Sequence, residues 1–301
     1  MLTCKTSLLN ISFALIFLFQ TNLSFGQNAL QAKISQYAKN VNGNVGVCAS
    51  VLETGETVSF NGDKKFPMQS VYKFPIAMVV LDRVDKKEFS LNQKIKVTKL
   101  DYIAKIGHSP LRDQFPNGTD IAIKDLVKYS VSESDGSASD ILVRLLGGTK
   151  YADRYIHQLG VKDIAIATTE KIQVENDTIQ YQNWATPKAM TSLLNIFYTQ
   201  HKLSAGSRAV LLNDMINSTP GAKRLKGLLP AGTIVAHKTG TAGTINGLTR
   251  ATNDVGIITL PNGKHLAITV FISDSRSSEA DRELTIAKIA KAAFEYWGIH
   301  K

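Results

Sequence analysis

Strand-like runs of apolar and β-branched residues lie near both ends of this chain, whereas its middle has mostly helical spacing. The predicted strands are 45–52, 57–60, 233–238, 255–260 and 265–272. Glu53-Thr54-Gly55-Glu56 and Pro261-Asn262-Gly263-Lys264 have the composition of hairpin turns, and each joins two of these strands. The strands at the two ends are therefore expected to form one sheet.

The spacing of apolar residues predicts helices between and beside these strands. An apolar helix begins at Ser70, and Thr186-Pro187 supplies an N-cap and a first-turn proline for another. The remaining helical segments are 29–39, 123–129, 140–146, 149–159, 204–217 and 278–297. Around Glu170 we expect an irregular, polar stretch that ends at Trp184.

This order of elements predicts an α/β fold with an additional all-α lobe. The sheet would be antiparallel, with about five strands built from both termini and flanked by helices. Residues 27–64 and 223–301 would form the α/β lobe, and residues 65–222 an inserted helical lobe. The boundary between two such lobes is a natural place for a cleft.

The N-terminus has the pattern of a secretory signal peptide. Lys5 precedes an apolar run over 8–19, and Ser24-Phe25-Gly26 places small residues before a cleavage point. We predict a signal peptide over residues 1–26 rather than a membrane anchor, because the run is too short to span a bilayer comfortably. The mature chain, residues 27–301, would then be a periplasmic protein without stable membrane association.

Charge and cysteine content exclude several other classes. The chain of 301 residues has a formal charge of +10, spread in singles and pairs rather than in a basic run with aromatics, so nucleic-acid binding is not expected. Loss of Cys4 with the signal would leave Cys48, which lies in an apolar strand and is interpreted as a core thiol. No His, Cys and Asp cluster has metal-ligand spacing, so we expect no metal and no cofactor.

Ser70-Val71-Tyr72-Lys73 is the one Ser-x-x-Lys sequence, and it stands where the apolar helix begins. On a helix the two side chains are neighbours at i and i+3, so the amine can reach the hydroxyl. A serine hydroxyl needs such a base to act as a nucleophile. Chance matches to so short a motif are common, so it indicates a catalytic serine only in combination with further motifs.

Three further features follow it in order. Ser134-Asp135-Gly136 follows a helical segment, Glu170 lies in the polar stretch, and Lys238-Thr239-Gly240 closes a strand. Taken one at a time, the Ser-Asp pair would be interpreted as a helix cap, Glu170 as a solvated acid and Lys-Thr-Gly as an ordinary strand end. Ser-x-x-Lys, Ser-Asp-Asn and Lys-Thr-Gly in this order are the signature of class A β-lactamases and penicillin-binding proteins.

The chain resembles the class A serine β-lactamases over essentially all of its mature length. The segments 115–119, 129–135 and 180–187 look like the extended-spectrum branch found in Bacteroidetes-type bacteria. The resemblance implies a β-lactamase/transpeptidase-like fold and hydrolysis of β-lactam antibiotics, with cephalosporins and penicillins as substrates, by a monomer that confers antibiotic resistance. A penicillin-binding D,D-peptidase and a β-lactam sensor without turnover remain alternatives.

The resemblance also implies the roles of individual residues. Ser70 would be acylated, with either Lys73 or Glu170 acting through a water as the base. Ser134 would pass a proton to the leaving nitrogen, and Glu170 would activate the water that hydrolyses the ester. The substrate-binding residues would lie on one strand, where backbone N–H groups of Ser70 and the last of them form the oxyanion hole. These residues are Lys238, Thr239, Gly240 and Thr241.

Some positions depart from the family pattern. Gly136 replaces the expected Asn, and Val174 stands where many relatives carry an Asn that holds the deacylating water; we still favour Glu170 over Glu175 as the base.

Three other positions are open to two readings each. The first is Arg224. Many relatives carry an arginine on the strand where this chain has Val255, and Arg224 could supply that positive charge from another element or be a surface residue. His108 could replace an aromatic gate or be loop surface, and His237 is expected to pack in the core rather than to catalyse.

Overall fold

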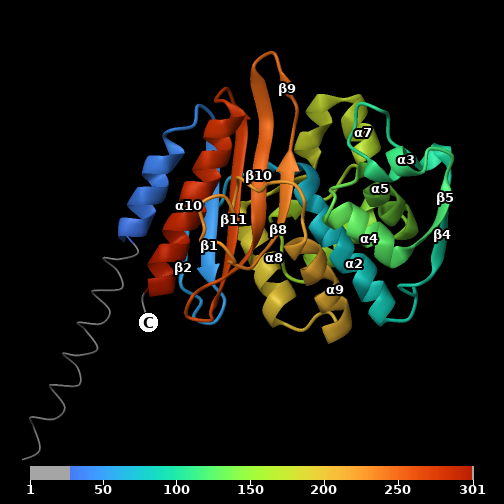
Figure 1. The fold of residues 1–301 in the computed structure, drawn as a ribbon, viewed down its shortest axis with the longest axis horizontal. Helices are drawn as coiled ribbons and strands as arrows, with labels where there is room; N and C mark the ends of the chain where they lie inside the picture. The colour runs from blue at the N-terminus through green and yellow to red at the C-terminus, as the bar shows by residue number, and fades with distance from the viewer. Residues whose placement is uncertain (1–27, 300–301) are drawn as a thin grey trace, which may run out of the picture.

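The computed structural model describes residues 28–299; the predicted signal peptide and Cys4 lie outside the described residues. Its main sheet is antiparallel, in the order β2-β1-β11-β10-β8, and the short β9 pairs with β10 (Figure 1). The bounds are β1 Asn44–Val51, β2 Thr57–Phe60, β8 Val235–Thr241, β9 Thr244–Ile245, β10 Leu248–Thr259 and β11 His265–Ser275. The sheet thus joins the two ends of the described chain, as the sequence predicts.

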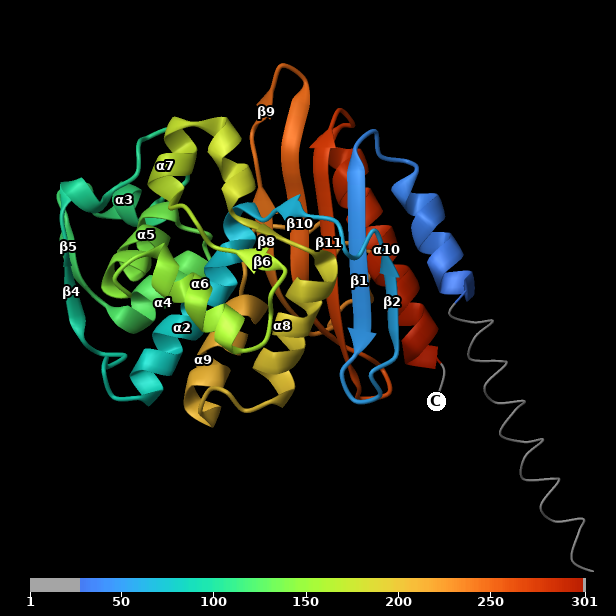
Figure 2. The ribbon, with the colours of Figure 1, turned by 180° about the vertical axis from the view of Figure 1, so that it is seen from behind.

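Helices cover both faces of this sheet, and β1, β8, β10 and β11 are therefore buried along almost their whole length. The first helix, residues 28–38, and α10 (Glu279–Ile299) lie together on one face (Figures 1 and 2). Side chains alternate along β11: Leu266 and Ile268 face that helix pair, whereas Ala267 and Phe271 face the helical part of the molecule.

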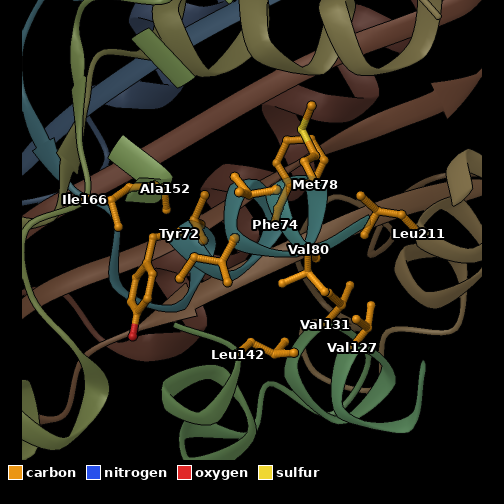
Figure 3. Packing of buried hydrophobic residues seen from close by; sticks show 14 of the residues in the cluster. Tyr72, Phe74, Met78, Val80, Val127, Val131, Leu142, Ala152, Ile166 and Leu211 are labelled. Carbon is orange, nitrogen blue, oxygen red and sulfur yellow. The ribbon is translucent and has the colours of Figure 1, made fainter. Parts of the chain in front are cut away.

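The helical part is built around α2 (Lys73–Asp85), which follows a 3₁₀ turn, η1 (Gln69–Tyr72). Every residue from Phe74 to Leu81 is buried. Figure 3 shows Phe74, Met78 and Val80 packed among side chains from surrounding helices. Those helices are α4 Ile123–Val131, α5 Gly136–Leu145, α6 Thr149–Gln158, α8 Pro187–Thr199 and α9 Ala205–Ile216.

The remaining elements are short and lie around this core. They are β3 Phe66–Pro67, β4 Lys94–Val97, η2 Lys99–Asp101, α3 Pro110–Gln114, β5 Thr119–Ala122, β6 Ile164–Ala165, α7 Glu170–Glu175, η3 Asp177–Gln182 and β7 Trp184–Ala185. They include two small sheets, β3-β7-β6 and β4-β5, which the sequence pattern did not predict. No described helix is both long enough and apolar enough to cross a membrane.

The predicted fold class is confirmed, but several element bounds were wrong. The α-helix expected from Ser70 begins at Lys73, after the 3₁₀ turn η1, and β10 begins at Leu248 rather than at 255. The strand that carries Lys-Thr-Gly is β8, which extends three residues beyond the predicted bound at Lys238 and ends at Thr241, so the motif does lie at the end of its strand. Helix α5 begins at Gly136, four residues earlier than expected, since the Asp135 side chain accepts a hydrogen bond from the backbone N–H of Ala138 and caps it. Glu170 begins the short helix α7 rather than lying in irregular chain. The residue boundaries of the two lobes stay a prediction.

Candidate active site

Ser70 and Lys73 stand where η1 passes into α2. Lys73 Nζ lies 2.9 Å from Ser70 Oγ and donates a second hydrogen bond to the carbonyl oxygen of Ser134, at 2.7 Å. Its side chain is only 1% exposed and lies 3.2 Å from Glu170 Oε2. One buried amine therefore touches the predicted nucleophile, the predicted proton relay and the predicted deacylating base.

Glu170 is placed by its neighbours on both sides of the chain. The Tyr72 hydroxyl donates to Glu170 Oε2 at 2.9 Å. The backbone N–H groups of Glu170 and Lys171 donate to the two carboxylate oxygens of Asp140, each at 2.8 Å. Asp140 on α5 thus fixes the first turn of α7, although the sequence reading did not select it. The one available signal was an acid beside the apolar run Ile141-Leu142-Val143.

The Asp140 carboxyl has an unusual acidity. Its pKa is raised from 3.8 to about 7, mainly by burial and also by the charge of Glu170, while the two backbone N–H donors and Lys73 oppose the rise. The anchor of α7 therefore carries a charge that is unfavourable in its surroundings.

Ser134 connects two lysines. Its hydroxyl accepts a hydrogen bond from Lys238 Nζ at 2.8 Å, while its carbonyl oxygen contacts Lys73. Its backbone has a φ of +58°, an uncommon conformation for a residue other than glycine. Burial, and then repulsion by Lys73, holds the pKa of Lys238 well below its usual range. An anion beside this amine would favour its charged form.

The strand that carries Lys238, Thr239, Gly240 and Thr241 runs against the segment before Ser70. A side chain on Gly240 would collide with the carbonyl oxygen of Met68, so glycine is required for this close approach. Thr241 is exposed at the end of the strand, and Thr239 is buried. The geometry therefore brings all of the predicted site residues to one region between α2, α7 and β8.

Side-chain amides hold the three residues before Ser70, and no sequence pattern had indicated these contacts. Asn253 on β10 donates from Nδ2 to the carbonyl oxygens of Pro67 and Met68, at 2.8 and 3.1 Å. Gln69, whose φ is +47°, donates from Nε2 to Gln180 Oε1 at 2.7 Å. These hydrogen bonds connect the segment before Ser70 to the main sheet and to η3.

Asp135 has a structural place beside the site. Its carboxylate accepts the backbone N–H of Leu111 at 2.6 Å and of Ala138 at 2.7 Å, as well as the Ser109 hydroxyl. Burial raises its pKa. It thereby ties α3 to the start of α5. His108 is exposed in the preceding loop, with Nε2 2.8 Å from the carbonyl oxygen of Glu133.

Arg224 is not a surface residue, so that interpretation was wrong. It is 4% exposed, and its guanidinium donates to the carbonyl oxygens of Asn253, at 3.0 Å, and Gly240, at 3.4 Å. Its Nε lies 3.1 Å from Glu283 Oε1. The guanidinium therefore lies beside the Lys-Thr-Gly strand, and its contact with a substrate stays a prediction.

Two further predictions concern buried residues of the sheet. His237 is completely buried, with Nδ1 2.9 Å from Asp254 Oδ1, which confirms its interpretation as a strand-packing histidine. Cys48 is a buried free thiol on β1, as expected, and burial raises its pKa. Within residues 28–299, no three His, Cys, Asp or Glu side chains are grouped so that they could hold a metal ion.

A buried lysine between a serine and a glutamate, beside a Lys-Thr-Gly strand, defines a serine hydrolase of the acyl-enzyme type. The sequence model of the "Beta-lactamase enzyme family" matches residues 29–297, and the chain belongs to this family. It is a class A serine β-lactamase, which hydrolyses the β-lactam amide and so confers antibiotic resistance; the predicted family and activity are confirmed.

Relatives of this chain agree in sequence and in structure. Beta-lactamase VEB-1 of Pseudomonas aeruginosa is 43% identical, over 89% of this chain and 90% of its own. Extended-spectrum beta-lactamase PER-1 of the same species is 40% identical, over 84% and 82%. The crystal structure of a β-lactamase from Chitinophaga pinensis DSM 2588 is 45% identical, covers 89% of this chain and 98% of its own, and has a TM-score of 0.87.

Proposed function

We propose that Ser70 attacks the lactam carbonyl and that Glu170 drives hydrolysis of the resulting ester. The observation that carries this assignment is the position of Lys73 Nζ, 2.9 Å from Ser70 Oγ and 3.2 Å from Glu170 Oε2. The Ser70 proton leaves either to Lys73 directly or to Glu170 through a water. The serine oxygen then bonds to the carbonyl carbon while the C–N bond of the lactam breaks.

The departing lactam nitrogen takes its proton from the Ser134 hydroxyl, which is reprotonated with the proton that left Ser70. The Ser134 hydroxyl contacts Lys238, and Lys73 lies at the Ser134 carbonyl oxygen, so two amines adjoin the relay. The backbone N–H groups of Ser70 and Thr241 stabilise the developing oxyanion, and loss of one such donor lowers the rate by roughly 10²–10³. Close packing of Gly240 against Met68 supports this arrangement, because it holds β8 next to the Ser70 segment.

The substrate carboxylate binds to Lys238 and Thr239. The substrate's negative charge would raise the lowered pKa of Lys238, so binding and protonation of the amine favour each other. Arg224, buried beside the same strand, adds a positive potential at this end of the site. Arg224 thus supplies the positive charge from outside the strand, where Val255 occupies the position at which many relatives carry an arginine.

Glu170 acts in the second half of the reaction. It takes a proton from a water molecule, whose oxygen bonds to the ester carbon; the bond to Ser70 Oγ then breaks, and the proton is returned to that oxygen. The Glu170→Gln variant should form acyl-enzyme with a chromogenic cephalosporin and retain it, detected as a mass increase of the protein. Undiminished turnover by this variant would remove Glu170 from the mechanism.

The same assay with the unaltered enzyme separates the alternatives. A hydrolase gives steady turnover, whereas a single stoichiometric burst with stable labelling of Ser70 would indicate a D,D-peptidase or a sensor. The contact of Glu170 with Lys73 supports the hydrolase.

We infer that cephalosporins are good substrates. The Thr241 hydroxyl is exposed beside the predicted carboxylate site, and PER-1 is named an extended-spectrum β-lactamase. The kcat/KM for a cephalosporin should therefore match or exceed that for a penicillin. A strong preference for penicillins would contradict this.

The mature enzyme is proposed to act in the periplasm as a monomer, after removal of residues 1–26, and without a cofactor or nucleic-acid partner. The signal-peptide pattern supports export. N-terminal sequencing of the periplasmic protein should give Gln27 as the first residue.

A further inference from the structure

Gly136 occupies a position with no room for a side chain. A Cβ added there would lie 2.5 Å from Glu170 Cγ and 2.6 Å from Ile103 Cδ1, both closer than real Cβ contacts allow. The backbone at Gly136 cannot easily retreat, since its N–H donates to the carbonyl oxygen of His108 at 3.0 Å and it begins the capped helix α5. The space that a side chain would fill is already taken by the base and by an isoleucine.

Ile103 is held in place from several directions. It is 2% exposed, and its backbone N–H donates to the Ser137 hydroxyl at 3.1 Å. Its Cδ1 also lies 2.6 Å from the place where a Cβ on Gly107 would be, and Val174 Cγ2 lies 2.8 Å from that same place. Because Gly107 and Gly136 have no side chains, Ile103 and Val174 can extend into the space beside them.

We propose that Ile103 is a positioning residue for Glu170, and that Gly136 provides the space in which the isoleucine and the glutamate methylene meet. Apolar packing against the Glu170 stem then positions the glutamate, a role that a polar side chain at position 136 would otherwise be expected to share. The carboxylate end of the glutamate is held by Tyr72 and Lys73, and its Cγ borders the same Cβ position at Gly136 that Ile103 Cδ1 borders from another direction. Restoring the family's asparagine would displace the base instead of improving the enzyme.

This inference rests on the proposed role of Glu170 in deacylation, and the first test uses Gly136→Ala and Gly136→Asn. Displacement of a catalytic group by about 1 Å lowers a rate by roughly 10²-fold. The deacylation rate should fall by about that factor, while the acylation rate falls less, so that kcat decreases more than kcat/KM and acyl-enzyme accumulates. Deacylation at the original rate in a folded Gly136→Ala enzyme would overturn the proposal.

Gly206→Ala is the matched control. Gly206 lies in the first turn of α9, has ordinary backbone angles, and an added Cβ there would have 3.9 Å to its nearest neighbour. It should keep the original kcat and thermal midpoint. Thermal unfolding of all variants separates displacement of the base from loss of the fold.

The role of Ile103 is tested by combining Ile103→Val, which removes a methyl group, with Gly136→Ala, which adds one. Ile103→Val removes the Cδ1 atom that Gly136→Ala would collide with, so the double variant should recover deacylation by about tenfold or more over Gly136→Ala. The vacated room lets the Glu170 stem move aside. A double variant that deacylates no faster than Gly136→Ala would contradict the role of Ile103.

Glu170→Gln distinguishes failure of this inference from failure of the proposed function. If Glu170→Gln traps the acyl-enzyme but Gly136→Ala does not, the base is correct and the positioning role is wrong. If Glu170→Gln turns over normally, the proposed function is wrong.

Discussion

Ser70 and Glu170 lie on opposite sides of Lys73, but they are held in different ways. Ser70 is anchored by α2, in which every residue from Phe74 to Leu81 is buried. Glu170 begins a six-residue helix in which only Gln173 is buried, and Ile172 is exposed. The nucleophile therefore depends on many apolar contacts, each of which contributes a little, whereas the base depends on a few discrete ones. Single substitutions are expected to impair deacylation more readily than acylation.

The largest effect is expected on the Glu170 side, from Asp140→Ala. It removes the acceptor for two backbone N–H groups in the first turn of α7 and leaves them without a protein partner. The kcat should fall by roughly 10²-fold through displacement of Glu170. Pre-steady-state kinetics with a chromogenic cephalosporin measure acylation and deacylation separately. Asp120→Ala, at an exposed acid on β5, should be close to neutral.

The charge on Asp140 gives the same anchor a pH dependence. Because its pKa is raised from 3.8 to about 7, the folded state binds this proton more tightly than the unfolded state. Its contribution to the free energy of unfolding is fully present below pH 3.8 and is lost as the pH rises through about 7.

Asp140→Asn cannot ionise, and it tests this dependence. Its stability relative to the original enzyme should increase between pH 5 and pH 8 by roughly 2–3 kcal/mol, since about two pH units lie between pH 5 and the pKa of about 7 and each corresponds to about 1.4 kcal/mol. Thermal unfolding at both pH values measures it. A stability difference independent of pH would show that Asp140 does not titrate in this range.

A smaller effect is expected on the Ser70 side, from Asn253→Ala. The carbonyl oxygens of Pro67 and Met68 lose their amide donor, but α2 continues to hold Ser70. We expect acylation to slow by about tenfold, because a buried acceptor left unsatisfied is unfavourable by about 1–3 kcal/mol and the segment shifts. A larger loss than that of Asp140→Ala would reverse the comparison between the two sides.

The smallest effect is expected from Arg250→Ala. Arg250 on β10 pairs with Asp177 in η3, and both side chains are about one quarter exposed. Exposed ion pairs contribute about 0.2–1 kcal/mol, so kcat and the thermal midpoint should change little. A tenfold fall in deacylation would show that η3, which follows α7 in the chain, transmits its position to Glu170.

Much of the fold could be predicted because its patterns are local. The hairpin turns, the capped helix at Thr186 and the apolar helix after Ser70 all depend on neighbouring residues. The two small sheets were missed because their strands have two to four residues, too few for a period to be recognised. The strand after Lys238 was cut short because Thr239, Gly240 and Thr241 have no apolar alternation, although they pair with β10.

The sequence by itself determined the sheet built from both ends, the helical middle, and the ordered series of Ser70, Lys73, Ser134, Glu170 and Lys238. These follow from periodicity, from turn composition and from motif order, all of which are properties of the chain alone. Only the tertiary structure decided that Asp140 anchors Glu170, that Asn253 holds the segment before Ser70, and that Arg224 is buried. It also showed that Gly136 faces Ile103, 33 positions earlier in the chain. Contacts of this kind depend on how packed elements share space, and no local pattern in a single sequence records it.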